Sequence, residues 1–479
     1  MRPMRSVLAS GLLAVAVAWV CVPTLAQSAP GQQQAPTQAP PAAAALQPGL
    51  AGRESLVSLA ALPDPSLPQP QVLDALLSDA PMLREAQSLK EAAAQNGQVL
   101  RSGTQEFTGQ AQVQQRRIDT APDAGTYAEW QLLLSRPIRL PSQTQADVRM
   151  AGALTHAADA TLIDVRQTLL QGALTAWFQA QLTQADVVLV KDNLALLHAQ
   201  VQALHRRNAL GDASVLELEQ LQAEEARAQS ALVLAQGLAE STRNALTTRY
   251  PAFADDSQLV GQPGSAAQLS LPALPVDALR TLVEQHSARL AQDRARLQEA
   301  QAAAEQAHAA RTPQPTVGAY LGSDRGGREH IVGLQFSMPF GGAARVARER
   351  SALAEVDAAQ WRLQDARAQT LAAFARLYAL ARSQASGALA LARASQVQNQ
   401  ASARMLRAYQ LGEAGVSDWL VARRSALDAV RQALQARFDA AESAASLRLQ
   451  AGLLLNRADV ANEPPRAAAV PASEPDRQK

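Results

Sequence analysis

The sequence predicts a mainly α-helical protein with a small β part, built as a two-fold internal repeat of long coiled-coil helices and two β-hairpins. Two relations predict the repeat. The Ser-x-Pro motifs at 135–137 and 337–339 lie 202 positions apart, and the Gly-acidic pairs at 211–212 and 412–413 lie 201 positions apart. Landmarks that keep their separation to within one residue indicate a duplicated unit. A third observation predicts the long helices: beyond Pro141, as far as Arg206, there is no proline and there are only two glycines.

The N-terminal residues 1–26 have the parts of an export signal. A positive start is followed by an apolar run over 7–22 and by small residues that predict cleavage near Ala26. The single cysteine, Cys21, lies inside this segment. A lipidated cysteine requires a small residue before it, and valine stands at 20, so we favour an unmodified Cys21 over a lipid anchor. The mature chain then has no thiol and no disulfide.

Charge and composition exclude several classes of function. The chain has 44 basic and 43 acidic residues, so no basic field is available to attract nucleic acid. Aromatic residues make up only 4%, which suits closely packed alanine-rich helices better than a compact enzyme. No later segment offers eighteen consecutive apolar residues, so any membrane crossing must use β-strands.

The sequence also lacks the motifs of catalysis. It has no phosphate-binding loop of the G-x-x-x-x-G-K-[ST] type and no G-x-S-x-G elbow. The six histidines are scattered; His198 and His205 lie two helical turns apart, without a third ligand near them in sequence. We therefore expect no enzyme activity, no catalytic residue, no cofactor and no metal site.

The same patterns divide the chain into segments. Residues 27–70 form a Pro/Gln/Ala-rich arm or linker, and residues 457–479 a disordered tail. The first repeat, 71–255, contains in order a helix, a hairpin at about 105–137, a long helix at 141–206, a tip at 207–215 and a helix to 250. After a linker at 256–275, the second repeat, 276–456, contains a helix, a hairpin at about 314–340, a long helix at 344–408, a tip at 409–417 and a helix to 456.

The long helices have coiled-coil periodicity. Leu194, Leu197, Val201 and Leu204 recur at steps of three and four. At roughly 1.5 Å per residue the first long helix extends about 100 Å. Two helices of about 35 residues, near 215–249 and 277–311, match one long helix when placed end to end, so we expect paired stacks beside each long helix.

The chain reverses at tips whose chemistry suits a tight turn. Gly211 and Gly412 can adopt the left-handed conformation that often ends a helix. Ser214 and Glu217 have the S-x-x-E spacing of a capping box for the returning helix. Taken alone, these features describe ordinary helical hairpins.

Short segments before each long helix alternate between apolar and polar residues. They occur at 107–114 and 127–136, and again around 317–321 and 332–338. Runs of this period joined by polar loops are typical of transmembrane β-hairpins. Candidate aromatics for the membrane interface, and the prolines that end the hairpins, are Trp130, Tyr127, Tyr320, Phe336, Pro137 and Pro339. Four strands cannot close a barrel, and an open edge is not tolerated in lipid; three copies give twelve strands.

The repeat, the strand ends SRPIRLP and SMPFGG, and the tips RNALGDAS and YQLGEAGVSDWL resemble those of the TolC-like outer-membrane efflux proteins. The resemblance covers about residues 72 to 456. YAEWQLLLSRPIRLP is similar to the heavy-metal cation efflux branch of that family. The resemblance implies a homotrimer that forms a 12-stranded β-barrel in outer-membrane lipid on an α-helical tunnel through the periplasm. It implies a passive exit duct for metal cations or small toxic compounds, to which an inner-membrane pump and a periplasmic membrane-fusion adaptor dock at the tips.

If this interpretation holds, the functional residues lie at the tips. The candidate docking residues are Arg207, Gly211, Asp212, Ser214, Tyr409, Gly412, Glu413 and Ser417. Glu217 and Asp418 occupy matching positions in the two repeats and are candidate gate residues, because carboxylate rings in a trimer favour cations.

Two other interpretations remain open. A periplasmic adaptor also uses long helical hairpins, although adaptors normally carry one hairpin between glycine-rich β-domains. A soluble coiled-coil scaffold without a membrane barrel makes the alternating segments incidental.

Overall fold

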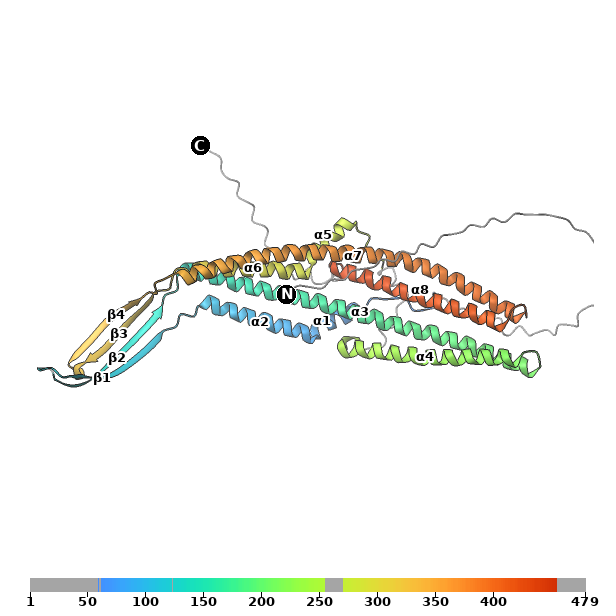
Figure 1. Ribbon diagram of the computed structural model, residues 1–479, viewed down its shortest axis with the longest axis horizontal. Coiled ribbons are helices and arrows are strands. Elements are labelled where there is room, and N and C mark those ends of the chain that lie inside the picture. Colours follow the sequence, from blue (N-terminus) through green and yellow to red (C-terminus); the bar gives the residue numbers. More distant parts are fainter. Residues whose placement is uncertain (1–58, 60–61, 123, 255–269, 455–479) are drawn as a thin grey trace, which may run out of the picture. The chain divides into compact units, whose positions relative to one another are not determined.

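The computed structural model describes residues 59, 62–122, 124–254 and 270–454 (Figure 1). The predicted export signal with Cys21, most of the arm before residue 62, most of the linker at 256–275 and the tail at 457–479 lie outside the described residues.

The two repeats contain the same α-helices and β-strands in the same order, which confirms the predicted mainly α-helical fold with two β-hairpins. The first repeat consists of α1 (Pro70–Asp79), α2 (Pro81–Ser102), β1 (Thr108–Ile118), β2 (Gly125–Pro137), α3 (Pro141–Ala209), α4 (Val215–Arg249) and the 3₁₀ turn η2 (Pro251–Phe253). The second consists of α5 (Val276–His286), α6 (Ala288–Ala309), β3 (Thr316–Asp324), the turn η5 (Arg325–Gly327), β4 (Glu329–Ser337), α7 (Ala343–Gln410) and α8 (Val416–Gln450). The long helices α3 and α7 have 69 and 68 residues.

One predicted helix is interrupted. The single helix expected over 277–311 is divided into α5 and α6, because Ser287 adopts an extended conformation and its hydroxyl accepts the amide of Leu290 at 3.3 Å. The first repeat has a corresponding break between α1 and α2, where Pro81 begins α2. The apolar periodicity continues across residue 287 and gives no sign of the break. The only local feature in the sequence is the serine, a residue that often caps a helix.

Heptad spacing explains how the helices pack. On α7 the buried residues Ala352, Ala359 and Ala366 are each seven apart, and on α4 Leu221 and Ala228 have the same spacing. A residue every two turns keeps one face toward the neighbouring helix, and alanine allows the backbones to approach closely. α3 packs against α2, α4, α6 and α8, while α7 packs against α6 and α8 (Figure 1).

The end of the segment expected to be an arm or linker over 27–70 packs against the helices and belongs to the core. Leu62 and Ser66 are buried. Trp177 donates its indole N–H to the Ser66 carbonyl at 2.6 Å, and Gln181 bonds both to the Ser66 amide and to its hydroxyl. Arg437 of α8 holds Asp64 at 2.9 Å. The backbone N–H and C=O groups of an extended segment are free to bond to side chains of neighbouring helices. The amino-acid composition of the segment does not predict such packing.

The four strands form one antiparallel sheet in the order β1-β2-β3-β4. Because β2 pairs with β3, the sheet joins the two repeats. Side chains alternate between its faces, and one face carries only exposed apolar groups along its middle. These exposed residues are Val113, Trp130, Leu132, Leu134, Val317, Leu321, Val332, Leu334 and Phe336.

The strand register corrects the expected set of interfacial aromatics. Trp130 and Phe336 lie on the apolar face, but Tyr127 and Tyr320 are an odd number of positions from the apolar residues of their strands and lie on the opposite face. There the Tyr320 ring covers Gly333, where any Cβ would lie 2.4 Å from the ring. We call the face that holds Tyr127 and Tyr320 the polar face.

Candidate functional site

The two tips have the same backbone structure. Gly211 and Gly412 have φ of 82° and 79°, which confirms the predicted left-handed turns. In each tip the residue after the glycine donates its amide to the carbonyl five residues earlier, Asp212 to Arg207 and Glu413 to Ala408, both at 2.9 Å. This pairing is the Schellman motif, and it satisfies carbonyls that the ending helix leaves free.

The returning helices are capped by different halves of a capping box, which corrects the box expected at Ser214 and Glu217. The Ser214 hydroxyl accepts the amide of Leu216 at 3.1 Å, but within the described residues the Glu217 carboxylate does not bond back to Ser214. In the second tip Gly415 has no side chain to cap with, and its amide instead donates to the Asp418 carboxylate at 3.3 Å. Glu217 and Asp418 therefore occupy matching positions but make different contacts.

Tyr409 connects the two tips. Its ring stacks on Trp419 with centroids 6.1 Å apart, inside an apolar cluster that also contains Leu204 and Leu221 of the first hairpin. Burial raises the pKa of Tyr409; the negative charge of Glu217 raises it further, and the positive charge of Arg207 lowers it. The Tyr409 hydroxyl is buried without a hydrogen-bond partner among the described residues. The fold thus brings three of the predicted tip residues together.

Polar bonds also cross between the hairpins. Ser417 bonds to Gln220 at 3.2 Å, and Arg424 of α8 forms two bonds with Glu224 of α4, one of them at 2.9 Å. The bond from Arg424 holds the pKa of Glu224 below its ordinary value of 4.5, against the effect of burial. Such bridges fasten the second hairpin to the first within one chain.

Arg423 is a functional candidate that the sequence analysis missed. Its side chain is only 4% exposed, and its Nε lies 2.9 Å from Oδ1 of Asn193 on α3. Burial lowers the pKa of Arg423 to about 10. No hydrogen bond reaches its Nη2 from the described residues. No pattern in the sequence predicts that Arg423 and Asn193, 230 residues apart, form a pair. The only indication in the sequence is that an arginine occupies a heptad position, which is typical of a buried polar layer in a coiled coil.

The outermost residues of the tips are also apolar. Leu210 is 78% exposed and Leu411 is 61% exposed, and the two occupy the same position just before the glycine of each tip. Arg207, Asp212, Gly412 and Glu413 surround them in the sequence and are exposed as well. The tips therefore present two leucines with a charged rim, which the sequence analysis did not single out.

His198 has a carboxylate partner that its sequence neighbourhood did not predict. Its Nδ1 lies 2.5 Å from Oε1 of Glu225 on α4, and Gln202 bonds to its other ring nitrogen. No group of three or more metal-binding side chains occurs in the part of the chain that the structure describes. The pair fastens α3 to α4.

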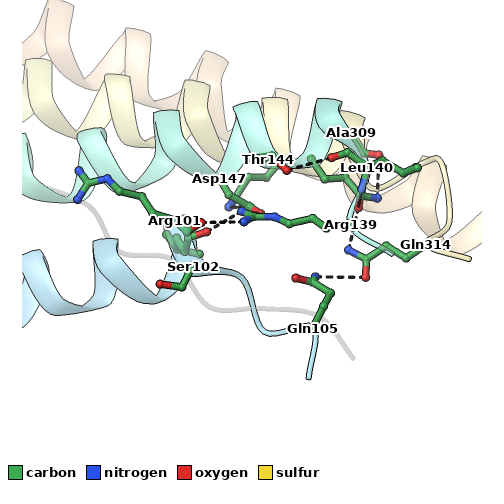
Figure 2. Close-up of polar contacts among 12 residues, drawn as sticks. Arg101, Ser102, Gln105, Arg139, Leu140, Thr144, Asp147, Ala309 and Gln314 are labelled. Carbon is green, nitrogen blue, oxygen red and sulfur yellow. Dashed lines mark hydrogen bonds and ion pairs between the residues drawn. The ribbon is translucent and has the colours of Figure 1, made fainter. Parts of the chain in front are cut away.

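A second polar network lies where the helices meet the strands. Figure 2 shows Arg139, just before α3, donating to the carbonyls of Leu100 and Arg101 at the end of α2 and pairing with Asp147. Cations at a helix C-terminus are favoured by the helix dipole. Asp147 also accepts from Gln306 of α6 at 2.7 Å. This network fixes three helix ends to one another.

Glutamines extend the network to the strands. Gln143 donates to the Thr312 carbonyl at 2.8 Å and accepts from Gln314 at 2.7 Å; Gln314 in turn bonds to Gln105 (Figure 2). Pro137 ends β2 and Pro339 follows β4, so both predicted prolines stand at this junction. The junction therefore sets the direction in which the sheet leaves the helices.

In the described residues, no helix is both long enough and apolar enough to cross a membrane. Comparison with known proteins finds no protein-family model and no curated protein that matches the chain. Solved structures do match, and the chain shares the fold of outer-membrane channels among them.

Three of these structures define the likeness. The outer-membrane channel OprN superposes with a TM-score of 0.67 at 18% identity, over 80% of this chain and 89% of that one. VceC from Vibrio cholerae gives 0.62 at 21% identity, over 80% and 95%. The open state of the Neisseria gonorrhoeae MtrE channel gives 0.60 at 19% identity, over 82% and 90%. At these identities the likeness establishes the fold.

Proposed function

We propose that this chain is the outer-membrane channel of a tripartite efflux system, a passive exit duct across the periplasm and outer membrane. The observation that carries the proposal is the sheet at the start of both long helices, whose exposed face is apolar along its middle. Water does not favour such a face, whereas lipid does. Similarity to solved outer-membrane channels supports the same conclusion.

The sheet also supports a homotrimer. Within one chain β1 and β4 each pair on one side only, so two edges of the sheet remain open. Unpaired backbone groups are costly in lipid, and four strands are too few to close on themselves. Three chains supply twelve strands and a lumen lined by the polar face. The number three comes from the family resemblance.

The tips are the proposed docking surface for the periplasmic adaptor, with the inner-membrane pump behind it. Leu210 and Leu411 add apolar contact area to the predicted docking residues. Glu217 is the better gate candidate of the predicted pair, because within the described residues its carboxylate does not bond back to the start of its own helix. Asp418 is committed to capping its own helix.

The proposed substrates are metal cations or small toxic compounds that the pump delivers. The sequence of the strand segment, YAEWQLLLSRPIRLP, favours the heavy-metal cation efflux branch of the family. The duct itself needs no metal ligand for this role, since selection can occur upstream at the pump.

Membrane fractionation tests the proposal most directly. The full chain should be found in the outer membrane, be extracted only with detergent, and have the mass of a trimer. Purified protein should then form water-filled channels in planar bilayers. A monomer released without detergent contradicts the duct and favours the alternative, a periplasmic coiled-coil adaptor or scaffold without a membrane barrel.

A further inference from the structure

The turn between β3 and β4 has an unusual backbone. Arg325, Gly326 and Gly327 have φ of 50°, 65° and 92°, so three successive residues are left-handed. This conformation suits glycine but is strained for arginine. Arg325 forms an ion pair with Glu329 at 3.3 Å, which helps to hold the turn closed. Strain of this kind persists where surrounding contacts specify the conformation.

The turn folds toward the polar face of the sheet. η5 contacts β2 as well as β3 and β4, the two strands that it joins. A Cβ built on Gly326 would lie 3.6 Å from Cδ1 of Tyr127, which is one of the polar-face residues. In Figure 1 the turn lies at the end of the sheet farthest from the helices. The strands themselves could end in a simple hairpin, so this inward fold is an added feature.

Glu129, two residues after Tyr127, is a buried carboxylate near the turn end of the polar face. It belongs to the polar face of β2 and is only 2% exposed, although its neighbours on that face, Gln112 and Gln131, are exposed. Its Oε2 accepts from Gln114 at 2.8 Å and lies 3.4 Å from Nε of Arg116. Its Oε1 is buried with no hydrogen-bond partner among the described residues.

We propose that the β3–β4 turn, residues 324–328, forms a constriction at the outer end of the duct. This inference rests on the proposed function, since the polar face lines a lumen only when three chains close the barrel. Three copies of the turn then project inward above the ring of Glu129 residues. The carboxylate is paired with Arg116, and the face below it carries neutral glutamines. Such a constriction excludes large solutes by size.

Cysteine accessibility tests this inference without depending on the state of the tips. Gln112→Cys places a thiol on the polar face, on the helix side of the turn. Cells that express the full chain are treated from outside with a small, membrane-impermeant maleimide or with a maleimide that carries a polyethylene glycol chain. The parent chain without the new cysteine gives the background. The small reagent should react readily, and the large reagent several-fold more slowly.

Tyr127→Ala removes the side chain on which the turn rests. It should increase the rate with the large reagent several-fold and leave the rate with the small reagent unchanged. Thr126→Ala, a change on the other face of the same strand, is the matched control. Trimer mass is measured for each variant, so that misfolded protein is recognised.

The outcomes separate the two proposals. If the large reagent already reacts as fast as the small one, or if folded Tyr127→Ala trimers leave both rates unchanged, the constriction is wrong while the duct stands. If the small reagent fails to react with Gln112→Cys in folded protein, the polar face does not line a water-filled lumen. That result overturns the proposed function and the constriction with it.

Discussion

Arg423 on α8 and Asn193 on α3 form a buried hydrogen bond of 2.9 Å that crosses between the two helical hairpins. Two further arginines of α8 reach the same hairpin, since Arg424 bonds to Glu224 and Arg431 bonds to Asp186 at 2.8 Å. Only the first of these bonds is buried. Through these three arginines, one interior bond and two surface bridges fasten the second hairpin to the first, in addition to the bond between Ser417 and Gln220.

The Arg423 bond leads to an asymmetric prediction. Asn193→Leu leaves a buried guanidinium without its partner and should lower the free energy of unfolding by about 2 kcal/mol. Arg423→Met removes the charge and fills similar space, so stability should stay unchanged or rise. Urea unfolding of the detergent-solubilised protein measures both. Equal losses from the two changes would contradict this account.

The lowered pKa of Arg423 predicts how the stability difference between Arg423→Met and the parent depends on pH. The folded pKa of Arg423, about 10, is below the ordinary value of an arginine, so burial costs the folded chain stability wherever the group is protonated in both states. That cost is constant from about pH 5 to about pH 8 and is relieved only as pH rises through the folded pKa. The stability difference between Arg423→Met and the parent should therefore be flat across this range. A difference that changes near neutral pH contradicts it.

Glu224 predicts sensitivity to acid. Its folded pKa lies below 4.5, so its bridge to Arg424 stabilises the fold above about pH 4.5, and the stabilisation is lost as pH falls through the folded pKa. Glu224→Gln should cost at most about 1 kcal/mol near neutral pH, because the pair is partly screened by water. It should also make the fall in melting temperature below about pH 4.5 shallower. Glu219→Gln, an exposed position of the same helix, is the control and should change neither.

A tip glycine and a glycine in the middle of a helix predict opposite effects from the same substitution. Gly412→Ala forces a side chain into the left-handed region and should destabilise the fold by about 1 kcal/mol, although nothing lies within 4 Å of the new Cβ. Gly387→Ala, in the middle of α7 and also in open space, should instead stabilise it by about 0.5–1 kcal/mol. Circular dichroism melting curves of the two variants give the comparison. A stabilised Gly412→Ala would show that the turn does not need its positive φ.

Local patterns in the sequence account for more of the fold than of the site. The long helices and the tip turns follow from the absence of proline and from glycine at the reversals, both of which act within a few residues. The break at Ser287 and the docking of Ser66 on Trp177 were not predictable, because a capping serine resembles any helix serine and extended backbone has no side-chain pattern. The site depends on contacts between repeats, such as Asn193 with Arg423, which are distant in the chain.

Glu217 and Asp418 give the last prediction, because the fold distinguishes residues that the sequence made equivalent. Asp418 accepts a bond from the Gly415 amide, so Asp418→Ala should cost about 1 kcal/mol of stability and leave the cation preference of the channel unchanged. Glu217 is half-buried and, within the described residues, does not bond back to the start of its own helix, so Glu217→Ala should raise single-channel conductance or alter cation preference. Planar-bilayer recordings of the two variants and the parent measure conductance and cation preference, and so show whether each carboxylate acts as a gate or only caps its helix. Unchanged conductance and selectivity in Glu217→Ala remove this residue from the gate, and a changed selectivity in Asp418→Ala returns the second carboxylate to it.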